Sequence, residues 1–149
     1  SKEDIDRAVR EAERFAEEFN AAGNVRFSIV DTTEELVRDA DVVVSCITDA
    51  NGYIVDEESL FKPGVLVVPV HTRGFQNCDT TFDQVFADDT DHVKGFKYFS
   101  QFREFHQIEE VLKGDVVGRA NDTERILSYN IGLGLHDVLY ASRIYDMLK

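Results

Sequence analysis

The sequence of 149 residues lacks the features by which several protein classes are recognised. It has only two cysteines, Cys46 and Cys78, so it carries no disulfide framework, and a reducing cytoplasm suits both thiols. No apolar run approaches the roughly 18 residues needed to span a bilayer. Acidic side chains outnumber basic ones by 29 to 16, and the net charge of −13 opposes binding to nucleic acid or to a membrane surface. Binding of a small dinucleotide stays open, because backbone amides at a helix N-terminus outweigh distant carboxylates.

The sequence also lacks the Gly-x-Gly-x-x-Gly turn that binds the pyrophosphate of a dinucleotide. This absence matters because two apolar runs, 41–47 and 64–70, have the pattern of buried parallel strands. Residues 125–134 have the pattern of a strand that turns into a last helix. The chain therefore predicts the back half of a nucleotide-binding sheet, with residues 1–149 forming one partial domain.

Strands alternate with helices along the chain, which predicts an α/β fold with a mainly parallel sheet. Residues 25–30 alternate apolar and polar, as expected of a strand near a sheet edge, whereas 42–47 is apolar on both faces and predicts a central strand. A third short apolar run covers 85–87.

Helices are predicted from apolar residues at spacings of three and four. They are expected at 2–19, just after Thr32, from Phe102 to Leu112, and over a final stretch of about 16 residues. Gly114 is expected to end the third of these, and a loop to follow it.

The strand order predicts a gap in the sheet. In the nucleotide-binding order 3-2-1-4-5-6, strand 1 lies beside strand 4. If 25–30 is strand 3 and 42–47 is strand 4, the first two strands are missing, and open edges would expose unpaired backbone groups. We therefore expect an incomplete Rossmann-type doubly wound parallel sheet that lacks its first two strands and has a long C-terminal helix. In that order the chain would not fold natively by itself.

Polar residues follow both central strands directly, where open α/β sheets bind their ligands. Ser45 and Thr48 follow the first, and capping or a polar turn is the alternative interpretation for them. His71 and Arg73 follow the second. His71 can transfer protons near neutral pH and Arg73 can bind a carboxylate with two hydrogen bonds, the alternative being a surface loop with a salt bridge.

Two further segments carry polar or glycine residues. Gly132 and Gly134 precede the last helix and would let a ligand approach the backbone closely, unless they serve helix packing instead. Asp88, Asp89 and Asp91 could hold a divalent cation, but capping of the following segment is the favoured interpretation. The histidines show no metal-ligand spacing, so no metal site is predicted.

The chain resembles the ornithine cyclodeaminase and mu-crystallin family in four segments: 40–45, 61–64, 87–89 and 122–137. The resemblance covers most of residues 8–149, and the last segment is the most specific. Members of that family are roughly twice as long. They have a Rossmann domain that binds a nicotinamide dinucleotide and a second domain that forms the dimer and much of the substrate pocket. The resemblance thus implies NAD or NADP, an amino-acid-like substrate and, in full-length form, a homodimer.

By position in this resemblance, Ser45 matches a threonine that lines the cofactor. Val70 and His71 match residues beside the nicotinamide, and Asn130 matches a serine or asparagine near the ring. The candidate cofactor-binding residues are therefore Ser45, Thr48, Val70, His71, Asn130 and Gly132.

One departure from the family pattern concerns catalysis. The cyclodeaminases place an aspartate acid/base in the loop after the second buried strand, with a lysine four residues later, where this chain has Arg73 and Asn77. A guanidinium cannot replace a carboxylate as general base. This counts against ornithine cyclisation, although the family includes imine reductases and amino-acid dehydrogenases that vary at this point.

We therefore expect part of a nicotinamide-dependent enzyme that acts on an amino acid or its imine, by cyclodeamination, dehydrogenation or imine reduction. Arg73 would bind a substrate carboxylate and His71 would donate a proton, and these are the two candidate catalytic residues. The fragment alone would be inactive. The alternatives are a non-catalytic protein that binds a dinucleotide or small ligand, as mu-crystallins do, and an autonomous interaction domain.

Overall fold

The computed structural model describes residues 2–21, 28–47 and 52–149 and divides into two compact units, Ser1–Leu36 and Val37–Lys149. In the first unit, helix α1 runs over Lys2–Ala21, which confirms the helix predicted there. The strand predicted at 25–30 falls partly outside the described residues, and 28–30 form no strand. A strand needs a neighbour to pair with, and every described strand pairs within the second unit.

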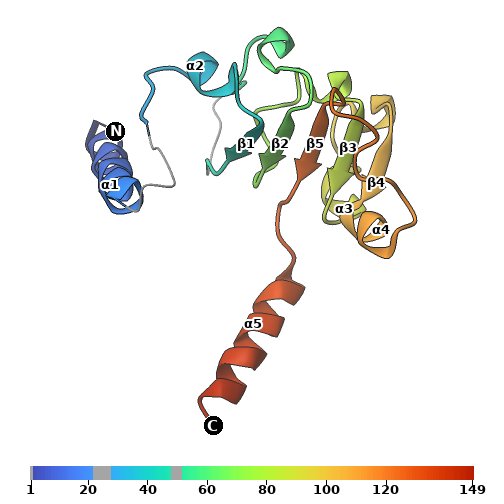
Figure 1. Ribbon diagram of the computed structural model, residues 1–149. Helices are drawn as coiled ribbons and strands as arrows, with labels where there is room; N and C mark the ends of the chain where they lie inside the picture. The colour runs from blue at the N-terminus through green and yellow to red at the C-terminus, as the bar shows by residue number, and fades with distance from the viewer. Residues whose placement is uncertain (1, 22–27, 48–51) are drawn as a thin grey trace. The chain divides into compact units, whose positions relative to one another are not determined.

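A parallel sheet of five strands forms the second unit, in the order β1-β2-β5-β3-β4 (Figure 1). The strands are β1 (Val42–Ser45), β2 (Leu66–Pro69), β3 (Gln84–Ala87), β4 (Phe105–Gln107) and β5 (Ile126–Tyr129). The helices beyond α1 are α2 (Thr33–Val37), α3 (Thr90–Val93), α4 (Ile108–Lys113) and α5 (Gly134–Met147). Short 3₁₀ turns lie at Glu58–Leu60, Asp79–Thr81 and Phe99–Gln101. The predicted α/β class, the parallel sheet and the C-terminal helix are confirmed.

The core lies on one face of this sheet. Val43, Val67 and Leu127 are in register across β1, β2 and β5, and all three are buried on that face. The connections between the strands cover them with aromatic side chains, of which Phe61 lies 5.5 Å from Phe82 between ring centroids. The large apolar side chains of this core fix the height and register of the strands.

Strand β1 has the open edge that the gap in the sheet predicts. Its apolar run is typical of a central strand, but in the described part of the chain β1 pairs with β2 alone, because the two strands expected beside it are missing. Val42 and Val44, which point to the face opposite the core, are 55% and 57% exposed. The exposed apolar face and open edge of β1 agree with a sheet that lacks its first two strands.

The helix predicted from Phe102 to Leu112 is wrong in its first half. Phe105 lies in β4, in register with Val85, and its ring packs 4.9 Å from that of Phe99 in an edge-on arrangement. Helix α4 begins only at Ile108. Pairing at the sheet edge and aromatic packing outweigh the helical spacing of the apolar residues. The predicted C-terminal glycine is confirmed, since Gly114 ends α4 in the left-handed conformation.

Helix α5 contains no buried residue. Several of its large apolar side chains are more than half exposed, namely those of Leu135, Val138, Tyr140, Ile144, Tyr145 and Met147. None of the helices that the structure describes is long and apolar enough to cross a membrane.

The turn before β2 requires a glycine at position 64, because the backbone of Asp122 lies very close to this residue. A Cβ atom at this position would lie 2.3 Å from the carbonyl oxygen of Asp122, and φ is +83°. We expect Gly64→Ala to lower the free energy of unfolding by at least about 2 kcal/mol more than Gly114→Ala, in chemical denaturation. Gly114 is the matched control, because φ is +81° there and no atom lies within 4 Å of an added Cβ. Equal losses in the two variants would contradict the close approach.

Candidate functional site

The candidate residues lie along the carboxyl edge of the sheet, where backbone pairing continues past the strand ends. The Val70 N–H donates to the Ser45 carbonyl (2.9 Å), and the Asn130 N–H donates to the Pro69 carbonyl (3.0 Å). Beyond them, the Asp88 N–H donates to the carbonyl of Tyr129 (3.1 Å). The ends of β1, β2, β5 and β3 are thus fixed side by side, which is where parallel sheets of this kind bind ligands.

Two of the predicted site residues are in direct contact. The Ser45 Oγ atom lies 2.6 Å from Nε2 of His71, within hydrogen-bonding distance. The imidazole stacks on Phe75, with 6.0 Å between ring centroids. Its other nitrogen, Nδ1, is buried and has no hydrogen-bond partner among the described residues. Since a neutral imidazole has one donor and one acceptor nitrogen, either tautomer leaves Nδ1 unsatisfied until a ligand or water reaches it.

The other residues predicted near His71 lie close to it in the sequence or outside the described residues. Val70 follows β2 and is 42% exposed, and Arg73 is exposed in the loop after it. Thr48 lies outside the described residues. The side-chain amide of Asn77 donates to the Val55 carbonyl (2.8 Å), so this residue anchors the loop to the chain before β2.

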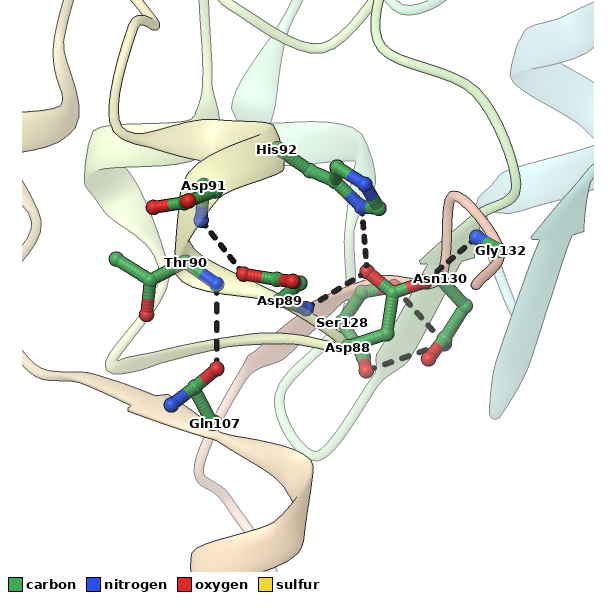
Figure 2. A network of polar contacts seen from close by, with 9 residues as sticks. All are labelled: Asp88, Asp89, Thr90, Asp91, His92, Gln107, Ser128, Asn130 and Gly132. Atoms are coloured by element: carbon green, nitrogen blue, oxygen red, sulfur yellow. Dashed lines mark hydrogen bonds and ion pairs between the residues drawn. The ribbon is translucent and has the colours of Figure 1, made fainter. Parts of the chain in front are cut away.

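A second group of site residues centres on Asp88, directly after β3 (Figure 2). Its Oδ2 accepts from the Gly132 N–H (2.6 Å) and its Oδ1 from the Asp89 N–H (2.9 Å). Nδ1 of His92 lies 3.3 Å from the same Oδ1. The Gly132 amide, predicted to face a ligand, is therefore engaged by a carboxylate of this chain.

Asn130 belongs to this second group rather than to the Ser45–His71 pair. Its side-chain amide donates to the Ser128 carbonyl (3.3 Å) and to Ser128 Oγ (3.2 Å). Both residues line a largely apolar cavity of about 320 Å³ beneath α4, on the sheet face opposite the core. Within the described residues no side-chain hydrogen bond joins the two groups, although the backbone places them on neighbouring strands.

The aspartates after β3 cap a helix. The Asp89 side chain accepts from the Asp91 N–H (2.8 Å) at the N-terminus of α3, and Asp91 pairs with Lys94. The capping interpretation is confirmed. Among the residues that the structure describes, no group of three acidic, histidine or cysteine side chains is arranged to hold a metal ion.

Asp79 is a buried carboxyl that the sequence did not reveal. It is fully buried directly after the loop that carries His71, and its Oδ2 accepts from the hydroxyl of Tyr129 (3.4 Å). Its Oδ1 has no hydrogen-bond partner in the described part of the chain. Burial raises the pKa of Asp79 to about 6 and also raises that of Tyr129. The sequence around it, Asn77-Cys78-Asp79-Thr80-Thr81, is polar and gives no signal of burial.

An open parallel sheet with polar side chains at its carboxyl edge defines an α/β domain of the Rossmann-type, doubly wound class. The chain belongs to the ornithine cyclodeaminase/mu-crystallin family, whose model matches residues 4–149.

Comparison with known proteins agrees with this assignment. The nodulation efficiency protein NfeD of Rhizobium meliloti is 36% identical over 127 residues, which cover 80% of this chain. A probable ornithine cyclodeaminase from Bordetella pertussis has a TM-score of 0.69 and 17% identity over 89% of the chain. The Δ1-pyrroline-2-carboxylate reductase of Thermococcus litoralis, solved with NADH and L-proline, has a TM-score of 0.73 and 18% identity over 92% of the chain.

The chain spans only part of each of these proteins. The match covers 39% of the length of the nodulation protein and 46% of each of the two solved chains. The two structural likenesses therefore concern the fold of about half of each solved chain.

The raised pKa of Asp79 predicts a pH-dependent contribution to stability. The folded state binds a proton that the unfolded state releases near pH 4, so stability falls as the pH rises from about 4 through about 6. We expect Asp79→Asn to remove this fall and to raise the free energy of unfolding at pH 7 by about 1–3 kcal/mol, measured by denaturation at several pH values. Asp137→Asn, at an exposed position, should follow the wild type. Parallel pH curves for Asp79→Asn and the wild type would contradict the burial of an ionised Asp79.

Proposed function

We propose that this chain supplies the nicotinamide-facing part of a dinucleotide-dependent enzyme that acts on an amino acid or its imine. The observation that carries the proposal is the hydrogen-bonded pair of Ser45 and His71 at the carboxyl edge of the sheet. Membership of the ornithine cyclodeaminase/mu-crystallin family supports it.

The residues present fit such a cofactor. The buried Nδ1 atom of His71 has no partner among the described residues, and it lies next to the end of β2. The nitrogen of a bound imine or amine, or a water molecule between them, would satisfy it once ligand binding opens this buried atom to the site. Ser45, Val70 and Asn130 lie on three neighbouring strand ends and would line the same edge of the ligand. When bound, the nicotinamide supplies or accepts the hydride.

The side chains of this chain have distinct roles in the proposal. His71 holds the proton that an imine nitrogen gains on reduction, or that an amine loses on oxidation. The Ser45 hydroxyl orients the imidazole through Nε2. Arg73 binds the carboxylate of the amino acid, for which a planar guanidinium offers two parallel N–H donors.

The finer parts of the proposal concern the whole enzyme. Imine reduction or amino-acid dehydrogenation fits Arg73 better than cyclodeamination does, because a guanidinium cannot serve as the general base. NAD and NADP are both compatible with the described residues. The full-length enzyme is proposed to be a homodimer, in line with its family.

A test uses the full natural polypeptide that contains these residues. We expect it to oxidise NADH or NADPH in the presence of a cyclic or linear imino acid. Arg73→Lys should raise the KM for the imino acid by about tenfold to a hundredfold, because a lysine loses the two-point contact. His71→Gln should lower kcat by about a hundredfold, because it removes the group that holds the proton.

Arg103→Lys is the matched control for Arg73→Lys. Arg103 lies before β4, at the opposite, amino end of the sheet, and pairs with Asp83 on the surface. This variant should keep the wild-type KM. Dinucleotide binding without turnover of any amino or imino acid would favour the non-catalytic binding protein instead. Absence of dinucleotide binding would overturn both.

A further inference from the structure

Asp88 makes hydrogen bonds to both ends of the segment that leads from β5 to α5. Its backbone N–H donates to the carbonyl of Tyr129 (3.1 Å), and its Oδ2 accepts from the N–H of Gly132 (2.6 Å). Residues 130–132 lie between these two bonds, and Figure 2 shows the carboxylate directed at Gly132. A single residue directly after β3 therefore fixes both ends of this segment.

The Asp88 carboxylate is itself held in place. Its side chain is only 10% exposed, and its second oxygen accepts from the Asp89 N–H (2.9 Å). The ring of His92, 34% exposed on α3, lies against the same oxygen. A buried carboxylate with several N–H groups directed at it is a rigid anchor, because movement would leave a charge without partners.

The segment that Asp88 holds carries two of the candidate cofactor residues. The backbone N–H of Asn130 donates to the carbonyl of Pro69 (3.0 Å), the residue just before Val70 and His71. Gly132 has a φ of +104°, a conformation that the Asp88 hydrogen bond helps to retain. A shift of about 1 Å in this segment would move Asn130 away from the edge that the other candidates share.

We infer that Asp88 is the positioning residue of this site. It holds the Asn130–Gly132 segment against the end of β2, and it makes the Gly132 amide unavailable to phosphate. Since a carboxylate already occupies that N–H, an approaching anion would meet a like charge. The segment therefore receives an uncharged or cationic part of a ligand. The consequence for a dinucleotide rests on the proposed function, whereas the structural role does not.

The test compares Asp88→Ala with Asp89→Ala in the full natural polypeptide. Both variants remove one carboxylate from the same turn, but only Asp88 bonds to residues 130–132, whereas Asp89 caps α3. By hydrogen exchange with mass spectrometry, we expect the peptide containing Gly132 to exchange at least about tenfold faster in Asp88→Ala and at the wild-type rate in Asp89→Ala. Equal rates in these two variants would overturn the positioning role.

A kinetic readout separates positioning from general destabilisation. In Asp88→Ala the KM for the dinucleotide should rise by about tenfold, with kcat at saturating dinucleotide within about threefold of the wild type. Asp88→Asn keeps an oxygen acceptor for the Gly132 N–H, so it should recover most of the exchange protection and of the affinity. Asp88→Asn also keeps the test decisive if Asp88→Ala fails to fold. A KM for Asp88→Ala equal to that for Asp89→Ala would contradict the inference.

The two proposals fail in different ways. If the polypeptide uses no dinucleotide, the proposed function is wrong, but the exchange rate at Gly132 still decides the role of Asp88. The amide of Gly132 can also be followed by NMR during titration with inorganic phosphate. We expect no shift in the wild type, and a phosphate-induced shift there would overturn the statement that Asp88 excludes anions.

Discussion

The insertion of β5 between β2 and β3 is the constraint on which the candidate site depends. This strand comes last in the sequence and is central in the sheet, with all four of its residues buried. Its register sets Leu127 beside Val67 and Val85, so the core is complete only when β5 is in place. The same register brings Asn130 to the end of β2 and Tyr129 to the end of β3. Core packing and site geometry are therefore one requirement.

The sequence predicts where the strands of this sheet lie along the chain better than it predicts which strands pair with each other. Apolar runs locate β1, β2, β3 and β5, because buried parallel strands need apolar side chains on both faces. The edge position of β1 follows from the strand order, because the two strands expected beside it are missing from the described sheet. The apolar pattern fails for Phe105, whose helical spacing to Ile108 is accidental once Phe105 pairs with Val85. Pairing is a long-range property that local periodicity does not contain.

In the candidate site too, the sequence predicts some of the residues, and others become visible only in the fold. Position after a buried strand was enough to select Ser45 and His71, which lie 2.6 Å apart. It was not enough to find Asp79, because nothing in a polar run indicates that one carboxyl is buried beside Tyr129. The sequence shows Asp88 only as one of three nearby aspartates, and the helix cap is its neighbour Asp89. Roles that depend on a partner 44 residues away, such as that of Asp88 with Gly132, become visible only in the fold.

The polar groups at this edge are compatible with the proposed binding of a dinucleotide by a strongly acidic chain. Phosphates would need free backbone amides at a glycine turn, and the sequence has no Gly-x-Gly-x-x-Gly turn. The Gly132 amide, which precedes α5, is engaged by Asp88. What remains at the ends of β1, β2 and β5 is a hydroxyl, an imidazole and a carboxamide, all of which suit an uncharged or cationic ring and its amide. Under the proposed function, the described residues would contact the reactive end of the cofactor, and groups other than these would bind the pyrophosphate.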